Sequence, residues 1–427
     1  MVRKYLAPAL LSLLSSWQPA ASQTKPAENT ARISSAKQPQ PTPQKANNVL
    51  RISVQGRNLI DSKGNVVQLR GANLSGLEFV AIQGWSPNDP WGGQVSSKLW
   101  SSVLDWKMNV VRLPLNQASW LGYTCVDGLG KTRNPDPGKN YQETVRAAVN
   151  KATALGLYVI VDLHWSAPDD IKRAVGEVKA MCPLEQNPIA DADHSIDFWR
   201  SIANTFKDHP NVIFELFNEP YLWWRPTDKS EWETLRDGGL MSDYVTGEGS
   251  NYQIKGHKWR AAGLQQLVDT IRATGATNVI AASGLDWGKK TDEWLTYRPN
   301  DPLKQLAAIW HAYPAFGKKW GSDAYAMPNY GKDAFTWATN ILSGGFPVII
   351  TETGDRNAPG IIGAPFVSKL LPWADKNGIS YLGWTFNVWQ NEDNVLLKDT
   401  AGTPTDGYGV YFKKHLMCAD GGEKNCP

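Results

Sequence analysis

Short apolar runs alternate with amphipathic segments along the chain from Val49 onward. Several runs are almost continuously apolar, such as Tyr158–Val161 and Val348–Ile350, which is typical of parallel strands covered on both faces. The pattern predicts eight strands, at Val66–Ala72, Asn109–Leu115, Tyr158–His164, Val212–Asn218, Asn278–Ser283, Ala307–His311, Phe346–Thr351 and Ser380–Phe386. It predicts helices at Tyr141–Leu155, Ser195–Lys207, Lys258–Thr274, Asp333–Leu342 and Phe366–Lys376.

This alternation predicts an α/β fold, a (β/α)8 TIM barrel, rather than an open doubly wound sheet. No Gly-x-Gly-x-x-Gly turn follows the first strand, which argues against a dinucleotide-binding fold. We expect the hairpin-like segment Leu50–Leu59 to close the bottom of the barrel. The loops that follow the strands would then form the active face.

The segments after the first four strands are long and contain several tryptophans. They cover Leu77–Gln94, Asn116–Asn140, Trp165–Asp193 and Tyr221–Gly256, and the last contains Trp223, Trp224 and Trp232. Long loops with no obvious structure are usually functional or disordered, and the flat face of an indole suits stacking on a sugar ring. The chain has 20 tryptophans, more than a core requires, so we expect Trp223 and Trp224 to line a sugar-binding cleft.

The first 48 residues differ from the rest of the chain. Arg3 and Lys4 precede an apolar run and the small residues Ala20-Ala21-Ser22, which predicts a secretory signal peptide at 1–22. Residues 23–48 are rich in Pro, Gln, Lys, Ser and Thr and predict a disordered linker. The catalytic domain is expected at 49–427, and the location is expected to be extracellular or periplasmic.

The formal net charge of +3 is small for 427 residues, so it indicates neither a nucleic-acid nor a membrane partner. Four cysteines in an exported chain can form disulfides, and we expect Cys125–Cys182 and Cys418–Cys426. A zinc site is the alternative, but no C-x-x-C pair is present and no histidine lies at finger spacing.

Two glutamates directly follow apolar runs that must be buried. Glu219 ends the run Val212–Glu219 before Pro220, and Glu352 ends the run Phe346–Glu352 before Thr353-Gly354. A carboxylate at such an edge is costly without a function. Hydrolysis of a glycosidic bond needs two carboxyl groups, so the pair predicts a glycosidase.

Other polar side chains lie at the same level of the predicted barrel. Arg112 lies inside an apolar strand and must be paired there, most naturally with a carboxylate at the barrel mouth. The remaining candidates at strand ends are His164, Asn218, His311, Tyr313 and Trp384. A barrel brings all of these strand ends to one mouth.

With these motifs the sequence resembles glycoside hydrolase family 5, the cellulase and mannanase family of retaining glycosidases. The resemblance covers roughly Val49 to Phe412, and all eight characteristic positions match in order. One departure is Thr353, where an aromatic residue is common in relatives. The resemblance implies a polysaccharide substrate, no metal and no organic cofactor, and we expect a monomer.

The resemblance also implies a double displacement in which Glu352 is the nucleophile and Glu219 the acid/base. Arg112 and Tyr313 would orient Glu352, Asn218 would bind the 2-hydroxyl, and Trp384 would lie under the sugar. His164 and His311 would complete the hydrogen-bond network. Arg112 is expected to keep Glu352 ionised, and the charge of Glu352 to raise the pKa of Glu219.

The sequence leaves the substrate open. The resemblance favours β-1,4-glucan cut by an endoglucanase, with β-mannan, xyloglucan or another β-glucan as alternatives. A non-catalytic sugar-binding barrel would be expected to have lost one of the glutamates, and both are present. A separate glycan-binding module fits poorly, since no second domain follows the linker.

Overall fold

The computed structural model describes residues 50–85, 97–127, 130–170, 179–222, 226, 228–242, 258–314, 328–355, 363–389 and 394–419. The predicted signal peptide at 1–22 and linker at 23–48 lie outside these ranges and stay predictions. Within the described ranges, no helix combines the length and the apolar character that crossing a bilayer would require.

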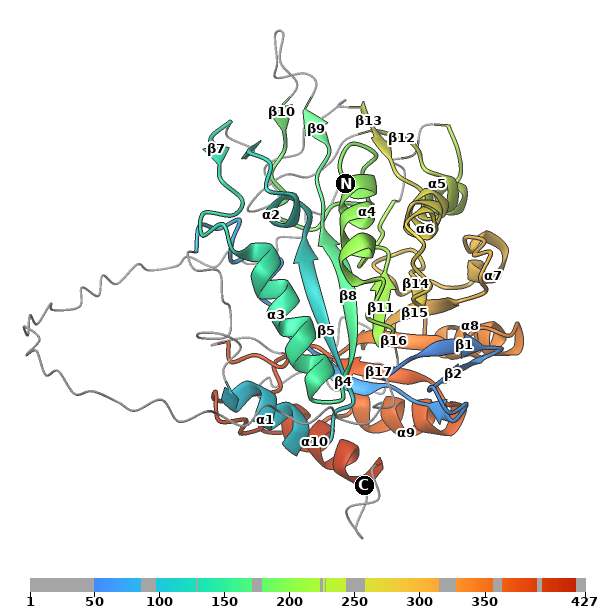
Figure 1. Ribbon diagram of the computed structural model, residues 1–427. Helices are drawn as coiled ribbons and strands as arrows, with labels where there is room; N and C mark the ends of the chain where they lie inside the picture. The colour runs from blue at the N-terminus through green and yellow to red at the C-terminus, as the bar shows by residue number, and fades with distance from the viewer. Residues whose placement is uncertain are drawn as a thin grey trace, which may run out of the picture. The chain divides into compact units, whose positions relative to one another are not determined.

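Eight parallel strands form a closed barrel at the centre of the domain (Figure 1). In barrel order they are β4 (Arg70–Asn73), β5 (Val110–Asn116), β8 (Tyr158–Trp165), β11 (Val212–Glu215), β14 (Ile280–Ala282), β15 (Leu306–Ala312), β16 (Val348–Thr353) and β17 (Ser380–Gly383). Each strand pairs with the next in the chain, and β17 closes the ring on β4. The predicted TIM barrel is confirmed.

Helices cover the outside of the barrel. They are α1 (Ser97–Asp105), α2 (Gln117–Leu121), α3 (Tyr141–Ala154), α4 (Ser195–Phe206), α5 (Glu231–Asp237), α6 (Leu264–Ala273), α7 (Trp294–Tyr297), α8 (Lys332–Ser343), α9 (Val367–Asn377) and α10 (Tyr408–Ala419). The five predicted helices are present as α3, α4, α6, α8 and α9. The sequence pattern did not predict α1, α2, α5, α7 or α10.

One predicted helix begins in the wrong place. Lys258–Ala261 forms strand β13, paired with β12 (Gly239–Ser242), and α6 starts only at Leu264. In β13, Trp259 and Ala261 are buried whereas Lys258 and Arg260 are exposed, which is the two-residue period of a strand. The helix prediction was therefore wrong for Lys258–Ala261, where burial alternates as in a strand before α6 begins.

Three predicted strands end or divide earlier than expected. The segment Val66–Ala72 contains β3 (Val66–Val67) and the separate barrel strand β4. Strand β11 stops at Glu215, four residues before Glu219, and β17 stops at Gly383. After Glu215 the chain still makes backbone hydrogen bonds to a neighbouring strand. The Asn218 N–H donates to the Leu163 carbonyl of β8 at 3.1 Å. Glu219 therefore remains at the barrel mouth.

A small antiparallel sheet of β1 (Ser53–Gln55), β2 (Asn58–Ile60) and β3 closes the amino-terminal end of the barrel. Ile52 and Leu59 are buried in one cluster with inward-facing strand residues such as Ile160 and Ile213. This packing confirms the expected role of the Leu50–Leu59 segment. The bottom of the barrel is therefore apolar.

The barrel interior becomes polar toward the carboxyl ends of the strands. Side chains two residues apart on one strand face the same side, so each apolar inward residue predicts the next inward position. Three strands change from apolar to charged in one such step, at Val110 to Arg112, Ile160 to Asp162 and Ile213 to Glu215. The charged layer lies directly above the apolar one.

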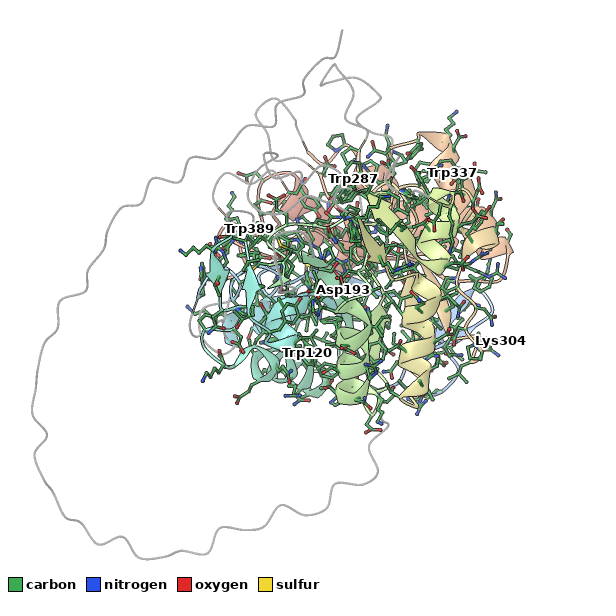
Figure 2. All side chains as sticks on the ribbon, turned by 90° about the horizontal axis from the view of Figure 1, so that it is seen from above. Trp120, Asp193, Trp287, Lys304, Trp337 and Trp389 are labelled. Carbon is green, nitrogen blue, oxygen red and sulfur yellow. A yellow bond between two sulfur atoms is a disulfide. The ribbon has the colours of Figure 1, made fainter. Side chains whose placement is uncertain are left out.

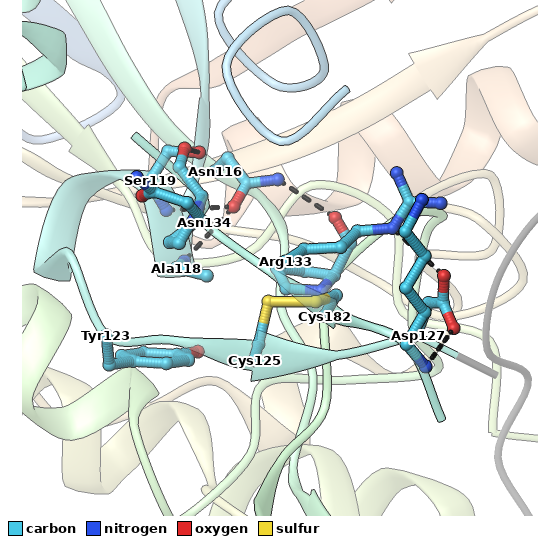
Figure 3. The surroundings of a disulfide bond; sticks show 12 residues. Asn116, Ala118, Ser119, Tyr123, Cys125, Asp127, Arg133, Asn134 and Cys182 are labelled. Atoms are coloured by element: carbon cyan, nitrogen blue, oxygen red, sulfur yellow. Dashed lines mark hydrogen bonds and ion pairs between the residues drawn. A yellow bond between two sulfur atoms is a disulfide. The ribbon is translucent and has the colours of Figure 1, made fainter. Parts of the chain in front are cut away.

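The predicted disulfide Cys125–Cys182 is present, with the two Cα atoms 5.0 Å apart (Figure 3). It joins β6 (Cys125–Val126), which pairs with β7 (Thr132–Arg133), to the loop after β9 (Asp169–Asp170) and β10 (Lys179–Ala180). Asn116 at the end of β5 donates to the Pro183 carbonyl beside it at 2.9 Å. Cys426 lies outside the described residues, so the pairing Cys418–Cys426 stays a prediction.

Tryptophans serve both the core and the loop side of the domain, and Figure 2 labels examples of each. Trp120 on α2 is buried against Phe198 and Phe206 of α4, whereas Trp287 lies on the loop after β14. Among the described residues, six tryptophans are less than 2% exposed and belong to the core: Trp100, Trp106, Trp120, Trp199, Trp294 and Trp310. Trp232, which sequence analysis placed among the loop candidates, is also buried, on α5.

Candidate active site

A cleft of about 380 Å³ opens at the carboxyl ends of the barrel strands. Six of the eight predicted site residues line it: His164, Asn218, Glu219, Tyr313, Glu352 and Trp384. The other two, Arg112 and His311, are fully buried directly beneath and contact the two glutamates. The barrel therefore brings all eight predicted residues together.

Glu352 is held by two donors from different strands. Arg112 Nη1 donates to Glu352 Oε1 at 2.7 Å, and the Tyr313 hydroxyl donates to Oε2 at 2.9 Å. Both oxygens of the carboxylate are thus satisfied by the partners that the sequence predicted. The next residue, Thr353, is buried and donates to the Ala312 carbonyl at 2.7 Å, which accounts for a threonine at this position.

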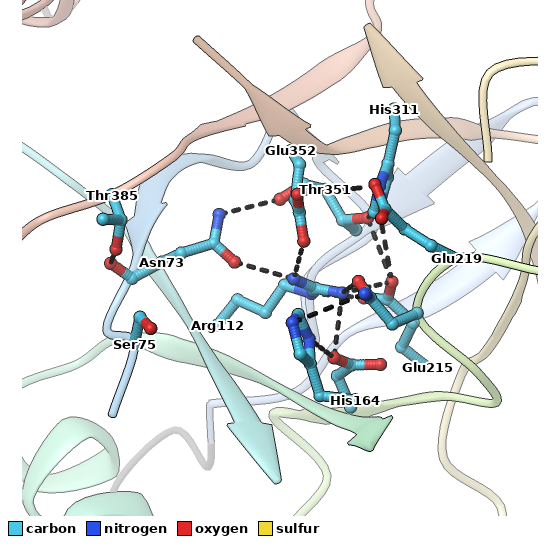
Figure 4. Close-up of polar contacts among 12 residues, drawn as sticks. Asn73, Ser75, Arg112, His164, Glu215, Glu219, His311, Thr351, Glu352 and Thr385 are labelled. Carbon is cyan, nitrogen blue, oxygen red and sulfur yellow. Dashed lines mark hydrogen bonds and ion pairs between the residues drawn. The ribbon is translucent and has the colours of Figure 1, made fainter. Parts of the chain in front are cut away.

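Arg112 is the centre of a larger charged network that sequence analysis missed (Figure 4). Its guanidinium contacts three carboxylates: Glu352, Glu215 through two bonds of 2.8 Å, and Asp162 at 2.9 Å. A buried guanidinium needs such partners, because an unpaired buried charge is very costly. The signal was available in the sequence, since Glu215 and Asp162 each interrupt an apolar strand run.

Two amides complete the coordination of Arg112. Nη1 donates to Asn73 Oδ1 at 2.9 Å, and Nη2 donates to Asn218 Oδ1 at 2.7 Å. Asn73 in turn donates to the Thr351 carbonyl on β16 at 2.9 Å. Asn218, which lies in the cleft, is therefore fixed in orientation by a buried cation, with its amide nitrogen directed 3.4 Å from His164 Nε2.

A β-bulge in β16 shapes the site. The register of β16 shifts by one residue against both β15 and β17 between Ile349 and Thr353. Successive residues of a regular strand point to opposite faces, and a bulge re-aims a side chain. As a result Thr351 and Glu352 both enter the site, Thr351 by bonding Glu215 and Glu352 by bonding Arg112.

His311 connects the two glutamates of the cleft to this buried layer. Its Nδ1 lies 2.8 Å from Glu219 Oε1 and 3.7 Å from Glu352 Oε2. Its Nε2 lies 3.0 Å from Thr351 Oγ1, and the Thr351 hydroxyl donates to Glu215 Oε1 at 3.1 Å. A hydrogen-bonded chain thus runs from Glu219 through His311 and Thr351 to Glu215.

The electrostatics place a proton on His311. Burial alone would lower the pKa of His311, but the carboxylates of Glu352, Glu215 and Glu219 raise it to about 10. Burial alone would raise the pKa of Glu219, but the hydrogen bond and charge of His311 outweigh burial and lower it. The prediction that Glu352 raises the pKa of Glu219 is therefore wrong for the ligand-free site, because it left out the imidazolium.

His164 is in a different state. Burial lowers its pKa, while burial raises the pKa of Asp162 well above the usual range despite the proximity of Arg112. The two groups share a hydrogen bond of 2.7 Å between His164 Nδ1 and Asp162 Oδ2. The His164 ring also stacks on Trp384, with centroids 5.7 Å apart and planes 6° apart, so it supports that indole from the side.

Among the described residues, one group could offer ligands to a metal ion: Glu219, His311 and Glu352, with ligand atoms within 4.8 Å of one another. Each of these side chains already has hydrogen-bond partners, and a protonated histidine does not bind a metal. The expectation that no metal or cofactor is needed stays a prediction.

The remaining walls of the cleft come from loops after several strands. They contribute Gln186, Trp287, Lys289, Asn329 and Asn394. None of these five was among the predicted site residues, and the loop tryptophans that the sequence favoured, Trp223 and Trp224, lie outside the described residues. Helix α10, also unpredicted, supports the floor, since the Tyr408 hydroxyl donates to the carbonyls of Thr353 and Trp384 at 3.0 and 3.1 Å.

Two glutamates at the mouth of a (β/α)8 barrel, with a paired arginine beneath them and Trp384 in the same cleft, define a glycoside hydrolase. The chain matches the family model "Cellulase (glycosyl hydrolase family 5)" over residues 60–390. The protein belongs to glycosyl hydrolase family 5.

Curated relatives carry names from the same family. "Cellulase CelDZ1" from Thermoanaerobacterium sp is 23% identical over 365 residues, which is 83% of this chain and 75% of the relative. "Endoglucanase 5" from Pectobacterium carotovorum subsp. carotovorum is 24% identical over 340 residues, 78% of this chain but only 50% of the relative. The chain thus spans half the length of some of its relatives.

Solved structures share the fold. The β-glucanase SdGluc5_26A from Saccharophagus degradans, solved in complex with cellotetraose, is 22% identical with a TM-score of 0.58, over 89% of this chain and 98% of that one. A β-mannanase from Streptomyces thermolilacinus is 18% identical with a TM-score of 0.51, over 84% and 93%. At these identities the likeness supports the fold alone.

Proposed function

We propose that the protein is a retaining endo-β-1,4-glucanase in which Glu352 is the nucleophile and Glu219 the acid/base. The observation that carries the proposal is the unequal environment of two adjacent carboxyl groups. An oxygen of each lies within 4.8 Å of the other, close to the ~5–5.5 Å of retaining enzymes and below the ~6.5–9.5 Å of inverting ones.

In the first step, Glu352 attacks the anomeric carbon while Glu219 protonates the departing oxygen. Glu352 suits the nucleophile because Arg112 and Tyr313 hold both of its oxygens in a fixed orientation. Glu219 suits the acid because His311 Nδ1, 2.8 Å away, can supply its proton. A bond to Glu352 forms as the glycosidic bond breaks, and the proton ends on the leaving group.

In the second step, Glu219 accepts a proton from water, and that water displaces Glu352 from the anomeric carbon. Asn218 is proposed to bind the 2-hydroxyl, because Arg112 fixes the amide and this contact strengthens in the transition state. Trp384, supported by the stacked His164 ring, is proposed as the floor under the sugar. These groups all come from one chain, consistent with a monomeric enzyme.

The proposed substrate is inferred from the similar proteins. The relatives described above are named cellulase and endoglucanase, and the structure of SdGluc5_26A is described in complex with cellotetraose, a β-1,4-glucan fragment. β-Mannan is the second candidate, because one structural neighbour is described as a β-mannanase. Xyloglucan and other β-glucans would use the same catalytic groups.

An extracellular or periplasmic location is also proposed. The basic start and apolar run of residues 1–22 fit a signal peptide, and the Cys125–Cys182 disulfide fits an oxidising compartment. A polysaccharide too large to enter a cell would require the same location. Mass spectrometry of the mature amino terminus would test the predicted cleavage after residue 22.

The test of the substrate is reducing-sugar release from carboxymethylcellulose, lichenan, glucomannan and xyloglucan. Carboxymethylcellulose should be cut, with viscosity falling faster than reducing ends appear, as internal cleavage requires. Proton NMR of early products should show the retained β-anomer. Activity on glucomannan alone would replace the glucanase by a mannanase, and an α-anomer would exclude the double displacement.

The test of the two glutamates uses single amide variants with Glu143→Gln, an exposed position on α3, as the control. Glu352→Gln should have no measurable turnover on any substrate. Glu219→Gln should lose ~10²–10⁴ in kcat/KM on the polymer, but far less on an activated aryl glycoside whose leaving group needs little protonation. Near-wild-type turnover of a folded Glu352→Gln variant would refute the assignment.

A further inference from the structure

Beneath the cleft, the chain of hydrogen bonds from Glu219 to Glu215 contains two residues to which no role has been given, Thr351 and Glu215. Both are fully buried and reach neither the cleft nor the solvent. Buried polar groups need partners, and here the partners are one another and Arg112. The arrangement leads from the predicted acid/base into the barrel without interruption.

The direction of each bond follows from the chemistry of the donors. A protonated imidazole has two donors and no acceptor, so Nδ1–H donates to Glu219 Oε1 and Nε2–H donates to Thr351 Oγ1. The Thr351 hydroxyl has one proton, and it donates that proton to Glu215 Oε1 at 3.1 Å. Glu215 Oε1 also lies 3.9 Å from His311 Nε2, so its charge acts on the imidazolium directly.

We infer that the Thr351 hydroxyl and Glu215 hold the Nε2 proton of His311, so that Nδ1 is the nitrogen that gives the catalytic proton to Glu219 and takes it back. The inference rests on the proposed function and names Thr351 and Glu215 as positioning residues. Neither touches substrate.

The proton balance is simple. In the resting site the His311 Nδ1–H bond breaks and a Glu219 O–H bond forms, which converts an imidazolium and a carboxylate into a neutral imidazole and a carboxylic acid. The neutral ring keeps its Nε2 proton because Thr351 Oγ1 accepts the hydrogen bond from Nε2–H. Glu219 then gives its proton to the leaving group, regains one from the attacking water, and returns it to Nδ1.

The surroundings shield this exchange. The Glu219 side chain is 17% exposed at the cleft, whereas His311 and Glu215 are not exposed at all, so the proton store is shielded from solvent. Gly288 lies next to the ring, because a Cβ added there would come within 3.1 Å of His311 Cγ, and the His311 backbone N–H donates to the Gly288 carbonyl. The loop after β14 therefore packs against the side of His311.

Titratable and charged groups from several strands face this chain. Arg112 lies against Glu215, and Asp162 lies against Arg112 on the same side. Glu352 and Tyr313 lie above His311, and His164 lies across the cleft. None of these changes in the experiment below, which removes only an uncharged hydroxyl.

The test is Thr351→Val, which keeps the shape of the side chain and removes the hydroxyl. Without the bridge the shared proton of His311 and Glu219 is less stabilised, so the alkaline limb of kcat/KM against pH should move to lower pH, by about one unit. On that limb the polymer kcat/KM should therefore fall about tenfold, part of the ~10²–10⁴ contributed by a positioned acid. The kcat/KM on an activated aryl glycoside should stay near wild type.

Two further variants separate positioning from packing. Thr351→Ser retains the hydroxyl and should restore the alkaline limb. Thr353→Val, two residues along β16, removes another buried threonine hydroxyl, one that donates to the Ala312 carbonyl outside the chain, and should leave the limb unchanged.

A Thr351→Val enzyme with the wild-type limb and polymer rate would overturn the inference. Equal losses in Thr351→Val and Thr351→Ser, or equal losses on polymer and aryl glycoside, would also overturn it by assigning Thr351 to packing. If wild type itself fails on β-glucan, the proposed substrate fails, and the same variants are then compared on the polymer that wild type does cut.

Discussion

Replacing Arg112 by methionine tests whether one buried cation holds the charged layer together. Arg112 is fully buried and contacts Glu352, Glu215 and Asp162 at 2.7–2.9 Å. Removing one partner of a buried ion pair typically costs ~3–5 kcal/mol, because it leaves an uncompensated charge. Since three carboxylates lose their cation here, we expect a loss of unfolding free energy at the upper end, about 5 kcal/mol at pH 7.5.

The loss should depend on pH. In the wild type, burial would raise the pKa of Glu215, but Arg112 and His311 lower it, so this carboxylate stabilises the fold above the unfolded pKa of ~4.3. Without Arg112 its folded pKa should rise above ~4.3, and such a group destabilises the fold until pH falls through that raised value. The deficit should therefore shrink at about pH 5, by ~1.4 kcal/mol for each pKa unit regained.

The assay is urea unfolding followed by tryptophan fluorescence, at about pH 5 and about pH 7.5. The matched control is Arg70→Met, because the Arg70–Asp375 pair is 24% exposed on both sides and should be worth ~1 kcal/mol or less. A loss for Arg112→Met no larger than for Arg70→Met, or one that is the same at both pH values, would refute the reasoning.

Three further predictions concern the supports of the site. Replacing Cys125 and Cys182 together by serine should cost ~2–5 kcal/mol of stability, measured by thermal unfolding, and an unchanged melting temperature would count against a stabilising role. Trp384→Ala should cost about 2 kcal/mol or more in kcat/KM on cello-oligosaccharides, as truncation of a central aromatic contact does, and a smaller effect would argue against its place under the sugar. A chain that starts at Val49 should keep its turnover on a soluble substrate within about twofold, since the composition of residues 23–48 predicts a linker; a folded but inactive product would contradict the linker prediction.

Much of the barrel could be predicted because parallel strands covered on both faces are continuously apolar, and such apolar runs can be recognised in the sequence alone. The strand Tyr158–Trp165 and the helix Tyr141–Ala154 agree with their predicted bounds to within one residue. Prediction was worse for segments whose secondary structure depends on pairing with strands far along the chain. Val66–Val67 joins a small sheet rather than β4, and Lys258–Ala261 is a strand because β12 lies beside it.

Eight residues at or beneath the barrel mouth could also be named in advance, because most of them are polar side chains that interrupt or follow an apolar strand. Glu215 and Asp162 break such runs too, but they lie deeper in the strands, and only the closed barrel reveals that both contact Arg112. Thr351 lies two residues after the inward-facing Ile349, so the alternation of β16 carries it to the inner face. Strict alternation would place Glu352 on the opposite face, and a bulge that depends on the registers of β15 and β17 brings it in.

The protonation of the site shows the same division. The sequence by itself determined which groups meet, since eight strand ends must converge on one mouth, and it therefore determined the pair Glu219 and Glu352. It could not determine which group holds the proton, because a pKa depends on distances and burial across strands that are far apart in the chain. Only the tertiary structure places His311 2.8 Å from Glu219 and beside Glu352, and that proximity decides that the imidazole stores the proton which the acid must deliver.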